Sequence, residues 1–98
     1  MIDPKDLARW CAVPADRLAA HPDRRVPLAL VADSAAMGEA MAAQLAATVV
    51  EARTAGRPAR VIVPCGPMAW YAPWRRLVNG QKLSLTHLHV FHMDECLD

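Results

Sequence analysis

The sequence predicts an α/β fold in which helices flank a parallel, Rossmann-like sheet in a three-layer arrangement. Three apolar runs have the length of strands, and they cover residues 26–32, 59–64 and 88–93. Helical patterns lie between consecutive runs, and this alternation is typical of parallel strands joined by right-handed crossovers. Continuous apolar runs are expected of strands that are covered on both faces. We therefore predict three parallel strands with crossover helices between them.

Residues 1–25 are predicted to form a helical lead-in ahead of the sheet. Asp3 suits the N-cap position and Pro4 suits the first helical turn. Apolar residues follow at three- and four-residue spacing until Pro14 ends the pattern. The segment is too short for a DNA-binding domain and has no basic recognition face, so we expect no nucleic-acid partner.

The first predicted strand, "VPLALVA", leads directly into a long helical pattern over residues 33–56. Asp33 or Ser34 can cap its first turn, Gly56 suits the C′ position, and Pro58 prevents the helix from continuing. The stripe predicted to pack into the core consists of Met37, Met41, Leu45, Thr48, Val49 and Ala52.

A tight turn, "CGP", separates the second predicted strand from a further helical pattern over residues 68–80. Pro73 lies inside this pattern and requires the regular helix to begin near Ala72. Asn79 and Gly80 are predicted to end the helix. A short connector then leads to the third strand.

Charge and composition exclude several classes of protein. The net charge of +1 gives no support for a nucleic-acid or membrane-surface partner. The sequence has no apolar run of transmembrane length, and its charged N-terminus lacks a signal core, so we expect a cytoplasmic protein. The three cysteines are widely spaced and form no CxxC pair, which argues against a disulfide framework and a structural zinc site.

The loop after the second strand is a candidate anion-binding turn. Ligands of open parallel sheets bind outside the carboxyl ends of the strands. The backbone amides of Cys65, Gly66, Met68 and Ala69 precede a helix and can face an anion there. The same residues also fit a simple strand-to-helix turn, and the residues alone leave both interpretations open.

Asp94 and Glu95 follow the third strand, at the same predicted edge of the sheet. Adjacent residues of an extended chain point to opposite sides, so the two acids are expected to differ in role. Asp94 shares a strand face with His92 and can act as a general base in the crevice. An N-cap role for the following element is the alternative.

The histidines around the third strand raise the question of a metal site. His87 and His89 are predicted to lie on one face of the strand and His92 on the other. Three ligands from these positions do not converge on one ion, so we predict no metal and expect partly buried, hydrogen-bonded histidines instead.

Two stretches, "VIVPCGPMAWY" and "VNGQKLSLTHLHVFHMDECLD", resemble the glucosamine-6-phosphate deaminase/isomerase family. The similarity runs from about Pro27 to Asp98 and is most specific in "FHMDE" and "PMAWY". The related 6-phosphogluconolactonases carry a Gly-Asp-Glu-Arg form of the acidic motif, and Met93 and Cys96 favour the deaminase/isomerase branch. By this resemblance, residues 26–98 form the N-terminal part of the α/β domain.

The resemblance implies a mechanism for the residues that match the family motif. Asp94 would be the base that moves a proton between C1 and C2 of an open-chain sugar phosphate. The substrate-binding residues would be Cys65, Gly66, Met68 and Glu95. The reaction interconverts an amino-aldose phosphate and a ketose phosphate with release of ammonia, and it needs no cofactor.

The family pattern differs from this sequence in two ways. The family turn reads roughly Thr-Gly-Gly-Thr-Pro, whereas Cys65, Gly66 and Pro67 form a shorter turn without a hydroxyl group. Family members are also longer, so the chain is expected to be an N-terminal portion that is inactive alone, with a possible homo-oligomer formed by the longer protein. A sugar-phosphate sensor module and a catalytically inactive fragment are the alternative functions.

Overall fold

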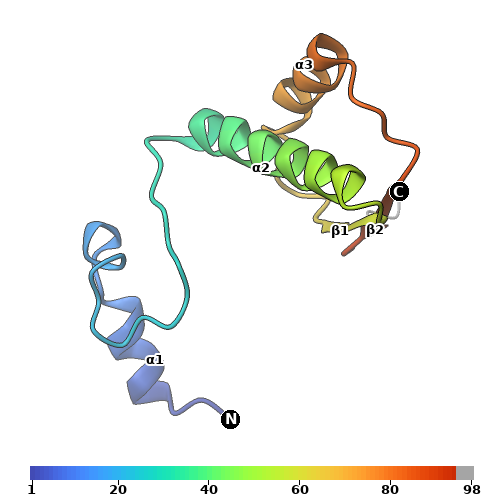
Figure 1. The fold of residues 1–98 in the computed structure, drawn as a ribbon. Helices are drawn as coiled ribbons and strands as arrows, with labels where there is room; N and C mark the ends of the chain where they lie inside the picture. The colour runs from blue at the N-terminus through green and yellow to red at the C-terminus, as the bar shows by residue number, and fades with distance from the viewer. Residues whose placement is uncertain (95–98) are drawn as a thin grey trace. The chain divides into compact units, whose positions relative to one another are not determined.

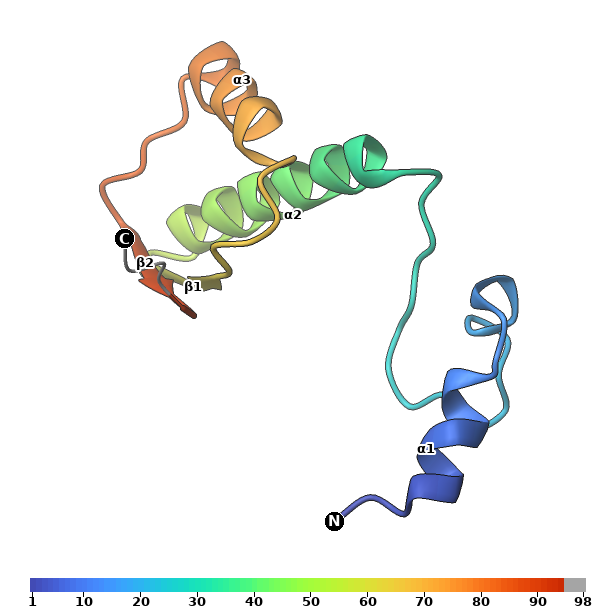
Figure 2. The same cartoon turned by 180° about the vertical axis from the view of Figure 1, so that it is seen from behind.

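The computed structural model describes residues 1–94 and consists of two compact units, Met1–Val31 and a second unit that begins at Ala32. Figures 1 and 2 show the elements of both units. In chain order these are α1 (Pro4–Cys11), a 3₁₀ helix (Ala15–Arg17), α2 (Ser34–Thr54), β1 (Ala59–Val63), α3 (Tyr71–Gln81) and β2 (Leu88–His92). No helix in the described part of the chain is both long and apolar enough to cross a membrane.

The first unit contains α1 and the 3₁₀ helix. The N-cap prediction is confirmed, because the Asp3 side chain accepts a hydrogen bond of 2.8 Å from the amide of Lys5, with Pro4 in the first turn. No residue of either helix is buried, and the apolar stripe of α1 is half exposed at Leu7 and Trp10. This unit therefore has helical order with little core.

The prediction of a strand at residues 26–32 was wrong. The backbone there is irregular, and Val26, Leu28 and Leu30 are all exposed. An apolar run becomes a strand only when a neighbouring strand takes up its N–H and C=O groups, and Pro27 has no N–H to offer. Within the described residues the sheet has the two strands β1 and β2, and not the three that we predicted.

The helix α2 confirms both predicted ends. The Asp33 side chain accepts a hydrogen bond of 2.8 Å from the amide of Ala36, and Gly56 adopts the left-handed conformation with a φ of 68°. The predicted stripe is only partly correct, since Val49 and Ala52 are buried whereas Met37 is exposed. The buried face is instead a row of mostly small residues, namely Gly38, Ala42, Ala46, Val49 and Ala52.

This row of small residues allows α2 to approach its neighbours closely. A Cβ placed on Gly38 would lie 2.3 Å from the carbonyl oxygen of Ala69, in the loop before α3. An exposed ion pair between Glu39 and Arg76 also joins α2 to α3. The predicted Met-rich stripe missed this contact because hydrophobicity ranks large side chains first, whereas backbone proximity selects small ones.

The strands β1 and β2 are parallel, as predicted, and Ala59 pairs with Leu88 while Val63 pairs with His92. The core joins α2 to β1 through Val49, Ala52 and Ala59, which are almost completely buried. Partly buried side chains surround these three residues, namely Leu45, Trp74, Leu85 and Leu88. The structure is thus a small α/β unit in which helices pack beside a parallel strand pair.

The helix α3 begins at Tyr71, one residue before the predicted start, and Pro73 lies in its first turn. A proline there removes an N–H that has no partner within the helix, so the helix tolerates it. The predicted end at Gly80 was slightly early, because the helix runs to Gln81 and the left-handed residue is Lys82, with a φ of 50°.

Candidate functional site

The candidate site lies where β1 and β2 end. Because the strands are parallel and in register, their carboxyl ends meet at one edge of the sheet. The turn that begins at Cys65 follows β1, and Asp94 follows β2. The amide of Met93 donates a hydrogen bond of 2.8 Å to the carbonyl of Val63, so the pairing continues one residue past β2.

The structure brings the two predicted loops into direct contact. The backbone N–H of Cys65 donates a hydrogen bond of 2.9 Å to Oδ1 of Asp94, although the two residues are 29 positions apart in the sequence. A hydrogen bond from an amide to a carboxylate is charge-assisted and stronger than a neutral one. The carboxylate of Asp94 is therefore held at the start of the turn.

This contact gives the Cys65 amide a positioning role. An N–H that points at Asp94 is engaged with a protein carboxylate, so it is not available to an anion in this arrangement. The predicted involvement of Cys65 in substrate binding stays a prediction. The geometry also shows that an acid and the turn after β1 share one edge of the sheet.

The remainder of the turn is open on the side of Gly66. A Cβ placed on Gly66 would meet no atom within 4 Å, and the Met68 side chain is exposed. The carbonyl of Met68 accepts a hydrogen bond of 3.1 Å from the amide of Tyr71 at the start of α3. The backbone of Gly66 is thus accessible to a ligand, as an anion-binding turn requires.

Glu95 and Cys96 lie outside the described residues, so their predicted roles stay predictions. The backbone bends at Met93 after β2 ends at His92. Asp94 therefore lies just beyond the regular strand, and strand alternation alone does not determine its direction.

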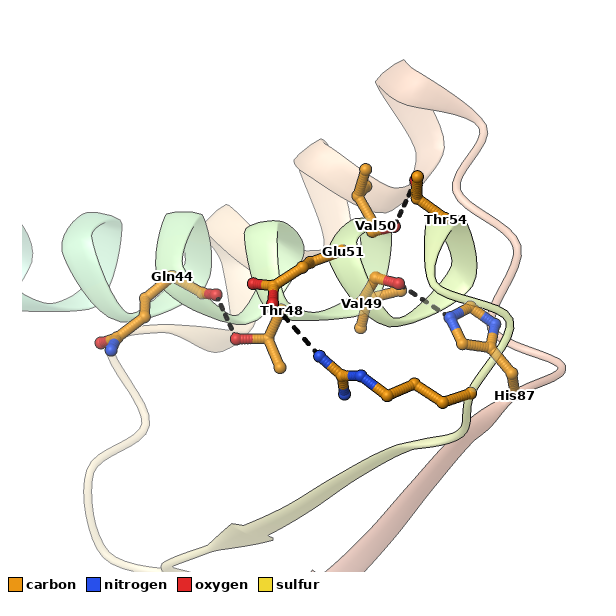
Figure 3. Close-up of polar contacts among 8 residues, drawn as sticks. Gln44, Thr48, Val49, Val50, Glu51, Thr54 and His87 are labelled. Atoms are coloured by element: carbon orange, nitrogen blue, oxygen red, sulfur yellow. Dashed lines mark hydrogen bonds and ion pairs between the residues drawn. The ribbon is translucent and has the colours of Figure 1, made fainter.

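The histidines are placed differently from one another. His87 is partly buried, and its Nε2 lies 2.8 Å from the carbonyl oxygen of Val49 on α2, which confirms the predicted hydrogen-bonded histidine at this position (Figure 3). His89 and His92 are exposed strand residues. In residues 1–94 no group of three or more His, Cys, Asp and Glu side chains is arranged to hold a metal ion.

Trp70, which lies between the turn and α3, was not among the predicted site residues. The side chain is 9% exposed, and its Nε1 is buried without a hydrogen-bond partner among the described residues. Trp70 lines a hollow of about 360 Å³ between α2 and β1, together with Gln44 and Thr48. The stretch "PMAWY" carried this residue, but no spacing rule distinguishes a tryptophan in a cavity wall from one in a core.

Comparison with protein-family models, with curated proteins and with solved structures finds no match for this chain. The function therefore has to be argued from the residues and from the contact between Cys65 and Asp94.

Proposed function

We propose that the chain carries the base-bearing part of an enzyme like the glucosamine-6-phosphate deaminases/isomerases. In this proposal Asp94 is the general base, and the substrate is the phosphate ester of an amino sugar. The hydrogen bond from the Cys65 amide to Asp94 is the observation that supports it, because it holds a carboxylate beside a turn that is open at Gly66. A residue that acts only as an N-cap would bind the following amides and would not need this bond.

The chemistry of such a site is a proton transfer. The Asp94 carboxylate removes the proton from C2 of the open-chain amino aldose, the electron pair of the C2–H bond moves toward the C1 carbonyl, and the C1 oxygen takes up a proton from the ammonium group at C2. The same proton, carried as the carboxylic acid, then returns to C1, which leaves an imine at C2. Water hydrolyses the imine to the ketose and releases ammonia. A positioned base of this kind contributes about 10²- to 10⁴-fold to the rate.

The turn would hold the substrate while Asp94 transfers the proton. We assign the backbone of Gly66 and Met68 to contacts with the ligand, and Glu95 to substrate binding as the family resemblance implies. The turn lacks a hydroxyl donor. The phosphate would therefore be bound mainly by backbone N–H groups of the turn and of the N-terminus of α3. The proposed enzyme has the three-layer Rossmann-like sheet, works without a cofactor and acts in the cytoplasm.

Ammonia release from glucosamine 6-phosphate tests the proposal, measured on the protein expressed from its complete reading frame. We expect turnover in the parent protein and a loss of about 10²-fold or more in Asp94→Asn, with substrate binding retained. The control Asp16→Asn removes an exposed carboxylate of the first unit and should leave turnover unchanged. Binding without turnover in the parent would indicate a sensor, and full turnover in Asp94→Asn would exclude Asp94 as the base.

A further inference from the structure

A second hollow lies at the opposite ends of β1 and β2, about 13 Å along the strands from the candidate site. It has a volume of about 380 Å³ and opens between the end of α2 and the connector that precedes β2. Its wall consists of Arg53, Gly56, Arg57, Pro58, Ser84, Thr86, His87 and His89. No part of the proposed function uses these residues.

The polar side chains in the wall of this hollow are basic residues, histidines and hydroxyl residues. Two guanidinium groups, two imidazoles and two hydroxyls line it, and none of the described lining residues is acidic. Arginine matches the geometry of phosphate oxygens with two parallel N–H donors, and hydroxyls add further donors. The set thus suits a compact anion with several oxygens.

His87 is fixed in the wall by α2. A carbonyl oxygen only accepts hydrogen bonds, so the 2.8 Å contact with Val49 requires a hydrogen on Nε2 of His87 (Figure 3). The ring is thereby anchored to the helix on one side. Ser84 and Thr86 also contact each other through their hydroxyls at 3.1 Å, so this side of the hollow is ordered before any ligand binds.

The carboxyl end of a helix carries partial negative charge, which opposes an anion. Here several carbonyls of the last turn of α2 are already hydrogen-bonded, because the amides of Ala55 and Gly56 donate to the carbonyl oxygens of Glu51 and Arg53. The amide of Arg57 donates in the same way to the carbonyl of Ala52. The two arginine side chains at this end carry positive charge that opposes the partial negative charge of the helix end.

One contact competes with a ligand for Arg57. Its guanidinium lies 3.2 Å from the carboxylate of Glu51, and both side chains are largely exposed. Exposed ion pairs of this kind are weak, so a doubly charged ligand can displace Glu51 from Arg57.

We propose that this hollow binds a phosphate dianion, either free or as the ester of a small molecule. The volume is within the range of small-molecule sites, and the arginines Arg53 and Arg57 supply the charge. The site is separate from Asp94. The proposal of phosphate binding therefore does not depend on the proposed enzyme activity.

A ¹⁵N-resolved NMR titration of the full chain tests the proposal, with inorganic phosphate and glycerol 3-phosphate as the two probes and chloride at equal ionic strength as the blank. We expect saturable shifts of the amides of Gly56, Arg57 and residues 84–89 with both phosphates and none with chloride. Stronger binding of the ester would favour a phosphorylated small molecule as the ligand, and weaker binding of the ester would favour free phosphate. Shifts elsewhere in the chain only, or no saturation at tens of millimolar, would overturn the proposal.

Charge variants make the test specific. The double variant Arg53→Gln/Arg57→Gln should weaken phosphate binding at least about tenfold, since each charge-assisted bond contributes about that factor. Glu51→Gln removes the competitor and should tighten binding about twofold. Arg75→Gln, an exposed position on α3, has the same charge change and should have no effect. If Arg75→Gln weakened phosphate binding equally, binding would depend on the overall charge of the chain and not on this hollow, which would contradict the proposal.

Discussion

The two units of this chain are both rich in apolar residues, but only the second buries them. In the first unit Leu7 and Trp10 are half exposed, and neither of its helices contains a buried residue. In the second unit Val49, Ala52 and Ala59 are sealed between α2 and β1. The difference shows that apolar content becomes stabilising only where small residues allow elements to approach, as Gly38 does for α2.

The largest effect should come from a charge at the centre of the buried cluster. Val49 is 1% exposed, so Val49→Asp places an unpaired carboxylate in the core and should destabilise the second unit by about 4 kcal/mol. Leu7→Asp makes the same kind of change on the half-exposed face of α1 and should change stability by less than about 0.5 kcal/mol. Urea denaturation followed by amide signals of each unit measures both. If both substitutions destabilised their units equally, the two units would not differ in how far they bury their apolar residues.

The next largest effect on stability is expected from substituting one of two helical glycines, Gly38 and Gly80. Gly38→Ala forces a Cβ into the space of the Ala69 carbonyl and should cost about 2 kcal/mol. Gly80→Ala adds a Cβ in α3 where no atom lies within 4 Å, and should stabilise the helix by about 0.5 to 1 kcal/mol. The opposite signs, read from thermal or urea unfolding, test whether α2 truly packs against this loop. A neutral Gly38→Ala would contradict the close approach.

Much of the helical structure was predictable because local signals determine it. Asp3 and Asp33 cap α1 and α2, Gly56 ends α2, and Pro73 falls in the first turn of α3. These features depend on neighbours within four residues, which a sequence displays directly.

What could not be predicted depends on distant partners. Residues 26–32 and 59–64 look alike as apolar runs, yet only the second forms a strand, because a strand requires a neighbour to pair with. The sequence placed Cys65 and Asp94 at one edge of the sheet, but the bond between them depends on how the backbone bends at Met93. Trp70 and the basic hollow were missed for the same reason.

The two apolar runs, residues 26–32 and 59–64, can also be compared without any mutation. In native hydrogen exchange, the amides that pair β1 with β2 should be protected, whereas those of residues 26–32 should exchange about as fast as in an unfolded chain. The paired amide of Ala59, which donates to His87 at 2.9 Å, is the most informative single probe. Comparable protection in residues 26–32 would mean that this run pairs as a strand in solution.

The proposed role of Asp94 depends most on the hydrogen bond that holds its carboxylate at the start of the turn. A through-bond NMR coupling between the ¹⁵N of Cys65 and the ¹³Cγ of Asp94 reports this hydrogen bond directly. We predict a detectable coupling in the parent chain, and its loss in Asp94→Ala together with faster exchange of the Cys65 amide. No coupling, with a Cys65 amide that exchanges at the same fast rate in both proteins, would show that Asp94 is not held at the turn and would contradict its assignment as the base.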